Sequence, residues 1–170
     1  MTAIIQLIDE AAIWLETKGT DQWARPWPSR ADRDSRILAH LRQGKTWLCR
    51  DGEITAATIT ADPDEDPYWS QYRPELAVYV HRLVINRAYA GRGLGAELLN
   101  WAGWTGQRRH GAAWIRVSAW TTNLGLHAYY RRQGFVLCGY HPDDGYPSAA
   151  RFQKSTALIP APGQLLFIEA

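Results

Sequence analysis

One stretch near the middle of the chain changes its hydrophobic period from two residues to about 3.6. From Leu76 to Ile85, large apolar side chains alternate with other residues, which predicts a buried strand. From Leu94 onward, apolar residues recur at helical spacing as far as Ala102. The sequence GRGLG, residues 91–95, lies between the two patterns. The pattern therefore predicts a strand, a tight glycine turn and a helix.

The rest of the chain repeats these two periods. Helices are predicted for residues 3–17, 30–43 and 124–133, besides one of about 15 residues after the glycine turn. Further strands are predicted for residues 46–50, 53–60, 112–120, 135–140 and 150–154. The strand at 112–120 follows the central strand and helix, and such a βαβ unit has parallel strands. The sequence thus predicts a single domain of mixed α and β structure (α/β, here α+β) over residues 1–170, with about six strands and about four helices.

The last residues form a C-terminal tail, residues 156–170, which contains the strand-like run QLLFI. A strand at this position has no place among the predicted elements. We expect Gln164–Ile168 to pair with a sheet edge, either in its own chain or in a partner chain of a homodimer.

Two polar loops carry aromatic residues. Residues 20–29, TDQWARPWPS, include Trp23 and Trp27, and residues 61–75, ADPDEDPYWSQYRPE, include Trp69. Long polar loops in compact domains are often functional, so these rings are candidates for the walls of a substrate pocket. Anchoring of the loops to the core is the alternative, and the sequence favours neither.

Charge is distributed unevenly along the 170 residues, although the net charge is only +2. Between Arg82 and His141 there are eight arginines and one acid, Glu97, whereas residues 1–81 carry nine basic and thirteen acidic residues. A polyphosphate ligand would bind in the basic middle part.

The two cysteines, Cys49 and Cys138, lack metal-ligand spacing, so no metal site is predicted. No apolar run is long enough to span a membrane, and a cytoplasmic protein is expected.

The glycine turn has the features of a phosphate site. Glycines allow a sharp turn and close approach of backbone N–H groups, and a helix N-terminus adds unpaired donors. A P-loop needs Gly-Lys-Ser/Thr, but Ala96 and Glu97 follow Gly95. A dinucleotide fingerprint needs an acidic residue about 20 positions on, and no Asp or Glu occurs between Leu98 and His141.

The turn and a second motif resemble the GNAT superfamily of N-acetyltransferases. The pattern Gln/Arg-x-x-Gly-x-Gly/Ala of that family is similar to residues 90–95, except that Ala90 stands at its first position. The second motif is Asn-x-x-apolar-x-x-x-Tyr-x-x-x-Gly-Phe, which is reproduced by Asn123, Leu126, Tyr130, Gly134 and Phe135. The resemblance covers roughly residues 45–154.

This resemblance implies a mixed sheet with a parallel, splayed strand pair at an acyl-CoA site. Acetyl-CoA would be the cosubstrate, without a metal. The central strand would bind the pantetheine arm and the turn would bind the pyrophosphate, with Arg87 or Arg92 replacing the charge missing at Ala90. The residues implied for CoA binding are Leu83, Val84, Ile85, Arg87, Gly91, Arg92, Gly93, Leu94, Gly95, Ala96 and Asn123.

Two side chains are candidates for proton transfer. By resemblance, Tyr130 occupies the position of the tyrosine that protonates the departing thiolate, and packing of a helix aromatic is its alternative. His81 shares a strand face with Tyr79 and resembles a strand histidine proposed as base in arylalkylamine acetyltransferases. An unperturbed imidazole has a pKa of about 6.5, so it can accept a proton at neutral pH. A structural role for His81 is the alternative to its role as a base, and the sequence favours neither. Tyr79 is a candidate substrate contact.

The resemblance implies an acyltransferase that acetylates a primary amine of a small molecule, amino acid or peptide by direct attack. Two alternatives belong to other classes: an acetyltransferase of aminoacyl-RNA, and a non-catalytic module that binds acyl-CoA. RNA binding is disfavoured because no recognised RNA module interleaves aromatic and basic residues, and neither DNA nor a membrane is an expected partner. The sequence does not identify the acceptor, the acyl chain length or the oligomeric state.

Overall fold

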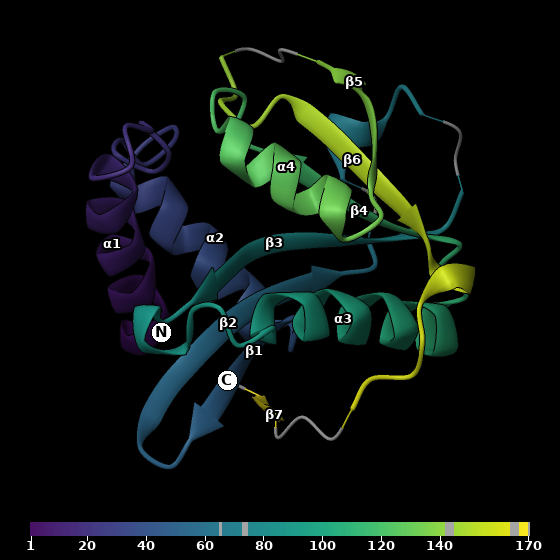
Figure 1. Cartoon of the computed structure of the whole chain (residues 1–170), viewed down its shortest axis with the longest axis horizontal. Coiled ribbons are helices and arrows are strands. Elements are labelled where there is room, and N and C mark those ends of the chain that lie inside the picture. The colour runs from purple at the N-terminus through teal and green to yellow at the C-terminus, as the bar shows by residue number, and fades with distance from the viewer. Residues whose placement is uncertain (65, 73–74, 142–144, 164–166, 170) are drawn as a thin grey trace. The chain divides into compact units, whose positions relative to one another are not determined.

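The predicted strand, turn and helix are present in the computed structural model of the chain (Figure 1). The structure describes all residues except 65, 73–74, 142–144, 164–166 and 170. The chain forms two compact units. Unit 1 contains residues 1–60, 82–95 and the C-terminal residues from 164 onward, and unit 2 contains residues 61–81 and 96–163. Whether residues 1–170 act as one domain stays a prediction.

The elements agree with the predicted ones to within about two residues at most ends. The α-helices are α1 (Thr2–Glu16), α2 (Arg30–Arg42), α3 (Leu94–His110) and α4 (Leu124–Arg132). Three 3₁₀ turns are η1 (Pro67–Trp69), η2 (Arg87–Tyr89) and η3 (Thr156–Leu158). The strands are β1 (Thr46–Asp51), β2 (Ile54–Asp62), β3 (Ala77–Ile85), β4 (Trp114–Ala119), β5 (Val136–Tyr140), β6 (Ala150–Ser155) and β7 (Phe167–Glu169).

The strands follow the order β5-β6-β4-β3-β2-β1-β7. β3 and β4 are parallel, as the βαβ pattern predicts, while β1–β2, β4–β6 and β5–β6 are antiparallel. β7 pairs antiparallel with β1 of the same chain. The tail therefore pairs with a sheet edge as expected, although residues 164–166 of the predicted strand lie outside the described part.

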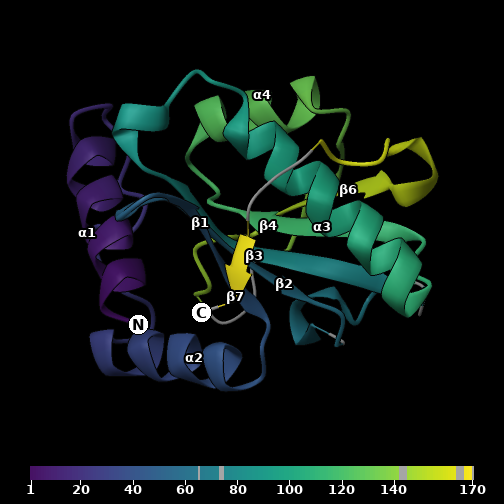
Figure 2. The same ribbon diagram turned by 90° about the horizontal axis from the view of Figure 1, so that it is seen from below.

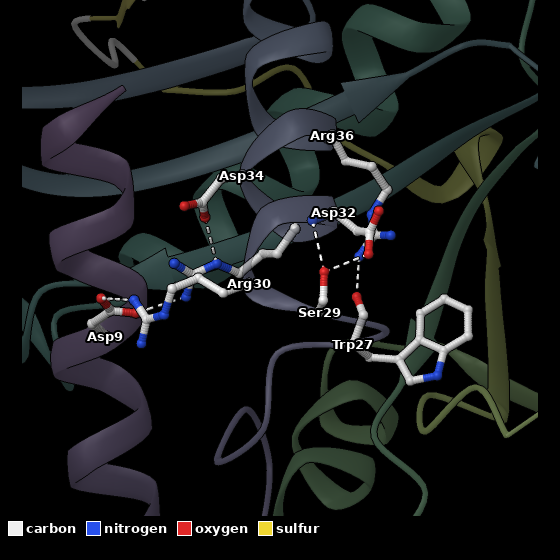
Figure 3. A network of polar contacts seen from close by, with 8 residues as sticks. Asp9, Trp27, Ser29, Arg30, Asp32, Asp34 and Arg36 are labelled. Carbon is white, nitrogen blue, oxygen red and sulfur yellow. Dashed lines mark hydrogen bonds and ion pairs between the residues drawn. The ribbon is translucent and has the colours of Figure 1, made fainter.

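In unit 1, two helices share a core with the strands. α1 contributes Ile4, Leu7 and Ile8, α2 contributes Ile37, and the strands contribute Leu48 and Val84. Figure 2 shows α1 and α2 as neighbours that run in different directions. Arg33 of α2 bonds to Asp9 of α1 at 2.7 Å and to Asp34 at 2.8 Å, and Ser29 caps α2 (Figure 3). The face of α1 that carries Ile4, Leu7 and Ile8 is thus its packed face.

In unit 2, the two faces of the sheet are covered differently. Val117 of β4 is in register with Phe152 of β6, and α4 packs Tyr130 and His127 on Phe152, with ring centroids 5.7 and 5.4 Å apart. α3 approaches the same face at Ile115, two residues before Val117. Both helices therefore lie on one face.

Aromatic residues of the 61–75 loop cover the opposite face. Tyr79, Arg116 and Gln153 are in register across β3, β4 and β6, and their side chains alternate with those that meet the helices. Trp69 packs on Tyr79 with ring centroids 6.2 Å apart, and only 2% of Trp69 is exposed. This loop segment is thus part of the core of unit 2.

The alternation predicted for the central strand is interrupted in one place. Arg82 has a φ of 48°, a left-handed conformation that is rare for a residue with a long side chain. Before it, Val78 packs beside Gly106 of α3, and after it Val84 joins the core of α1 and α2. Val78 and Val84 are expected to share one face, but they pack against different helices.

Candidate active site

The glycine turn is shaped by two residues with positive φ. Gly91 and Gly93 have φ values of 79° and 83°, and a Cβ built at either position would meet nothing within 4 Å. The turn is therefore open on its outer side and needs glycine for its conformation. α3 begins at Leu94, so the first N–H groups of the helix follow the turn directly. Such an arrangement fits an anionic phosphate.

One arginine precedes this turn and another lies within it, and both stack on aromatic rings of unit 1. The guanidinium of Arg87 lies 3.7 Å from the ring centroid of Trp14 on α1. The guanidinium of Arg92 lies 5.1 Å from the ring of Tyr89, whose hydroxyl donates to Asp51 at 2.7 Å. Both arginine side chains belong to exposed residues. Arg92 lies within the turn itself and is the better placed to replace the charge missing at Ala90.

The parallel strands separate at the level of His81. The register of β3 with β4 runs from Ala77–Trp114 to Val80–Val117, whereas β3 continues to Ile85 and β4 to Ala119. The left-handed Arg82 follows at once, and its Nη2 lies 3.3 Å from Thr60 Oγ1 in unit 1. Non-glycine residues with such conformations occur often at functional sites. The predicted pantetheine strand, residues 83–85, begins just after this point.

Tyr130 lies on α4 in an aromatic environment. Its ring packs on Phe135 and Phe152, with centroids 5.5 and 5.7 Å away, and only 8% of the residue is exposed. Burial raises the pKa of the Tyr130 hydroxyl well above its usual range. The side chain therefore keeps its proton at neutral pH, as a general acid must.

Asn123 is the N-cap of α4. Its side-chain oxygen accepts the backbone N–H of Leu126 at 2.9 Å, which is the ordinary capping bond. The helix that carries Tyr130 is thus fixed at its start by the first residue of the same motif. This contact gives Asn123 a structural role beside the cofactor contact implied by resemblance.

His81 faces a buried carboxylate that the sequence does not single out. Its Nε2 lies 3.8 Å from Oδ2 of Asp66, and the exposed fractions of the two side chains are 25% and 8%. Asp66 is the N-cap of η1, where its Oδ1 accepts the N–H of Tyr68 at 2.9 Å. The dipeptide Asp66–Pro67 is a recognisable start of a helical turn. That signal indicates the cap but not its nearness to His81.

The four aromatic residues predicted to bind substrate fall into two groups. Trp69 and Tyr79 lie together in unit 2, where Trp69 donates to Ser118 Oγ at 3.1 Å and Tyr79 accepts from Arg116 at 3.2 Å. Trp23 packs on the α1–α2 core of unit 1. Trp27 lies in the same unit, where Arg36 of α2 donates to its carbonyl oxygen (Figure 3).

The two candidate proton-transfer residues belong to opposite faces of the sheet in unit 2. Tyr130 packs on the face of Phe152, which α3 and α4 cover. His81 follows Tyr79 by two residues and meets Asp66, so it belongs to the face that the 61–75 loop covers. The structure thus provides one group on each side of the sheet where β3 and β4 separate.

Comparison with known proteins identifies the family of the chain. The family model of the acetyltransferase (GNAT) family matches residues 8–135. The chain belongs to this family. An uncharacterized N-acetyltransferase, YesJ of Bacillus subtilis, is 30% identical over 141 residues, which are 81% of this chain and 77% of the relative. The predicted family is therefore confirmed.

Solved structures of acetyltransferases share the fold. A GNAT acetyltransferase from Listeria monocytogenes matches 89% of this chain and 87% of its own, with a TM-score of 0.69 and 22% identity. A Bacillus subtilis acetyltransferase solved in complex with CoA matches 70% of this chain and 80% of its own, with a TM-score of 0.51 and 13% identity. The predicted fold class, a mixed sheet with a parallel central pair, is confirmed.

Two further structural facts concern the helices and the grouping of side chains. In the described ranges of the chain, no helix combines the length and the apolar character that a membrane span requires. Among the same residues, no three His, Cys, Asp or Glu side chains gather as a metal site would require.

Proposed function

We propose that this chain is an N-acetyltransferase that moves an acetyl group from acetyl-CoA to a primary amine of a small molecule, amino acid or peptide. The main support is its membership of the GNAT acetyltransferase family, together with a glycine turn open to a ligand at the start of α3. The CoA complex of a protein with the same fold supports the choice of acyl donor.

Backbone N–H groups of residues 92–96 hold the pyrophosphate in this proposal, and Arg92 adds a positive charge beside it. The observed φ values of Gly91 and Gly93 fit this role, because a side chain at either position would be strained and would occupy the open side of the turn. Residues 83–85 bind the pantetheine arm through their backbone. Acetyl-CoA supplies an activated thioester carbonyl.

The transfer needs two proton movements and no covalent enzyme intermediate. The amine nitrogen forms a bond to the acetyl carbon, and the bond between that carbon and the sulfur breaks. His81 accepts the proton that the amine loses, and Tyr130 gives a proton to the sulfur. The two side chains lie on opposite faces of the sheet in unit 2, which supports separate roles for them at the amine nitrogen and at the sulfur.

The proposal extends to partners and location. The acceptor is a small-molecule or peptide amine, and the protein works in the cytoplasm without DNA, a membrane or a metal as partner. An aminoacyl-RNA acceptor is the alternative from another class, and it predicts RNA binding that weakens steeply with salt. A second alternative, binding of acyl-CoA without catalysis, predicts CoA binding without turnover.

A panel of amines, amino acids and peptides tests the function. The purified protein is incubated with acetyl-CoA and each amine, free CoA thiol is measured, and the acetylated product is identified by mass spectrometry. We expect thiol release in a one-to-one ratio with an N-acetylated amine. CoA binding without turnover on the whole panel, or turnover only with aminoacyl-RNA, would contradict the proposal.

A further inference from the structure

Asp66 is held on the sheet face of His81 by three separate anchors. Its own Oδ1 caps η1 by accepting the N–H of Tyr68. The next residues are fixed to two strands of unit 2. Trp69 donates to Ser118 of β4 at 3.1 Å, and the carbonyl of Tyr68 accepts Arg151 Nε of β6 at 3.0 Å. The position of the carboxylate relative to β3 is therefore set by β4 and β6 rather than by a free loop.

The two oxygens of this carboxylate face different partners. Oδ1 bonds to the backbone, whereas Oδ2 lies 3.8 Å from Nε2 of His81. Only 8% of the Asp66 side chain is exposed, so water screens its charge weakly. A quarter of the His81 side chain, 25%, remains exposed, which leaves the ring within reach of a ligand.

We propose that Asp66 is the positioning residue of His81 and orients the imidazole with Nε2 protonated, so that Nδ1 accepts the proton of the attacking amine. This inference rests on the proposed acetyl transfer. A carboxylate near one ring nitrogen favours the proton on that nitrogen and stabilises the imidazolium that forms when the other nitrogen accepts a second proton. In the balanced step, the amine proton moves to Nδ1, and Asp66 stays ionised throughout.

Other charged and titratable groups surround the Asp66 loop in unit 2. Burial raises the pKa of the Tyr146 hydroxyl, and the charge of the Asp66 carboxylate raises it further. The guanidinium of Arg151 lies 5.8 Å from the Tyr146 ring, and that of Arg116 lies 5.0 Å from the Trp69 ring. On β3, His81 is flanked by Arg82, whose guanidinium bonds to residues of unit 1.

The test replaces Asp66 with asparagine. The asparagine amide would keep an oxygen that caps η1 and would lose only the charge, so Asp66→Asn separates positioning from folding. The matched control is Asp64→Asn, which removes the same charge from an exposed residue of the same loop. The titration of His81 is followed by NMR of the imidazole, assigned by its loss in His81→Gln, and kcat/KM is measured across pH on an active amine.

We expect Asp66→Asn to move the midpoint of the His81 titration to lower pH by about one unit, because the imidazolium loses its neighbouring anion. kcat/KM should fall about tenfold or more, and its acidic limb should move in the same direction. Asp64→Asn should leave both unchanged.

A His81 midpoint that stays in place in Asp66→Asn overturns the inference, whatever the activity. An inactive wild-type protein contradicts the proposed function instead, and the NMR titration still decides for or against the role of Asp66.

Discussion

The hydroxyl of Tyr130 keeps its proton because aromatic rings replace water around it. The Tyr130 ring packs on Phe135, Phe152 and Tyr129. Burial raises the pKa of the Tyr130 hydroxyl above the usual tyrosine value of about 10. A phenol with a raised pKa is neutral below its pKa, so it stays a donor across the whole neutral range. Ionisation of Tyr130 therefore cannot produce a limb of a rate profile between about pH 6 and 9.

Tyr130→Phe removes only the hydroxyl and keeps the packed ring. We expect kcat to fall by about 10²–10⁴-fold, because a general acid is lost, while CoA affinity stays near that of the wild type. Both limbs of the remaining pH profile should keep their positions. Steady-state kinetics and calorimetry measure these effects. Tyr129→Phe, which removes the hydroxyl of the neighbouring ring, is the control and should turn over normally. Full turnover of Tyr130→Phe would reject the acid role.

The motif residues can be identified from the sequence, but the residues that contact the candidate site residues cannot. Asn123 and Tyr130 can be found because their spacing is local and belongs to one helix and its cap. Asp66 cannot be linked to His81 from the sequence, since the contact depends on how a 15-residue connection folds over the sheet. For Trp69 the sequence favours neither a pocket wall nor a core anchor. It is 2% exposed, which shows that it packs in the core, and a role in substrate binding stays a prediction.

α3 is fitted to the sheet through two glycines with different neighbours. A Cβ at Gly106 would lie 2.8 Å from Cγ1 and 2.9 Å from Cβ of Val78. A Cβ at Gly103 would meet the terminal Cδ1 of Ile159. The first contact is with the stiff, branched part of a strand residue, whereas the second is with the end of a flexible side chain. Gly106 therefore sets how closely α3 approaches β3.

The pair Gly106→Ala and Gly103→Ala tests this fit. Alanine improves helix propensity by up to about 1 kcal/mol at either position, but overpacking costs about 1–3 kcal/mol where the neighbour cannot move. We expect Gly106→Ala to lower the free energy of unfolding by about 1–2 kcal/mol and Gly103→Ala to change it little. Urea unfolding measures both. Equal stabilities of the two variants would contradict the close approach at Gly106.

Regular elements are predictable from the sequence, and their irregularities are not. The helical and alternating patterns locate α1 to α4 and β1 to β6 because apolar residues recur in the sequence at the period of each element. The left-handed Arg82 leaves no signal in the sequence, since any residue type at this position would be predicted as strand. The strand in the tail is predictable from its apolar run, but its pairing with β1 in the same chain is one of two choices that the sequence leaves open.

The chain as a whole joins an acidic first part to a middle part that carries eight arginines and one acid between Arg82 and His141. The glycine turn begins the helix of this basic part, although Ala90 departs from the family pattern. The central claim is that the turn still binds the pyrophosphate of CoA, because backbone N–H groups do most of the binding and Arg92 supplies the missing charge. Arg92 stacks on Tyr89 beside the turn.

Calorimetry of CoA binding to the wild type, Gly93→Asp and Gly93→Asn tests this claim most directly. Gly93 has a φ of 83°, and both replacements tolerate such a conformation about equally. They differ in charge alone. We predict that the wild type binds CoA, that Gly93→Asn binds more weakly, and that Gly93→Asp loses at least about tenfold more affinity because a carboxylate opposes the phosphates. Wild-type affinity in Gly93→Asp, or no binding of CoA by the wild type, would contradict the account.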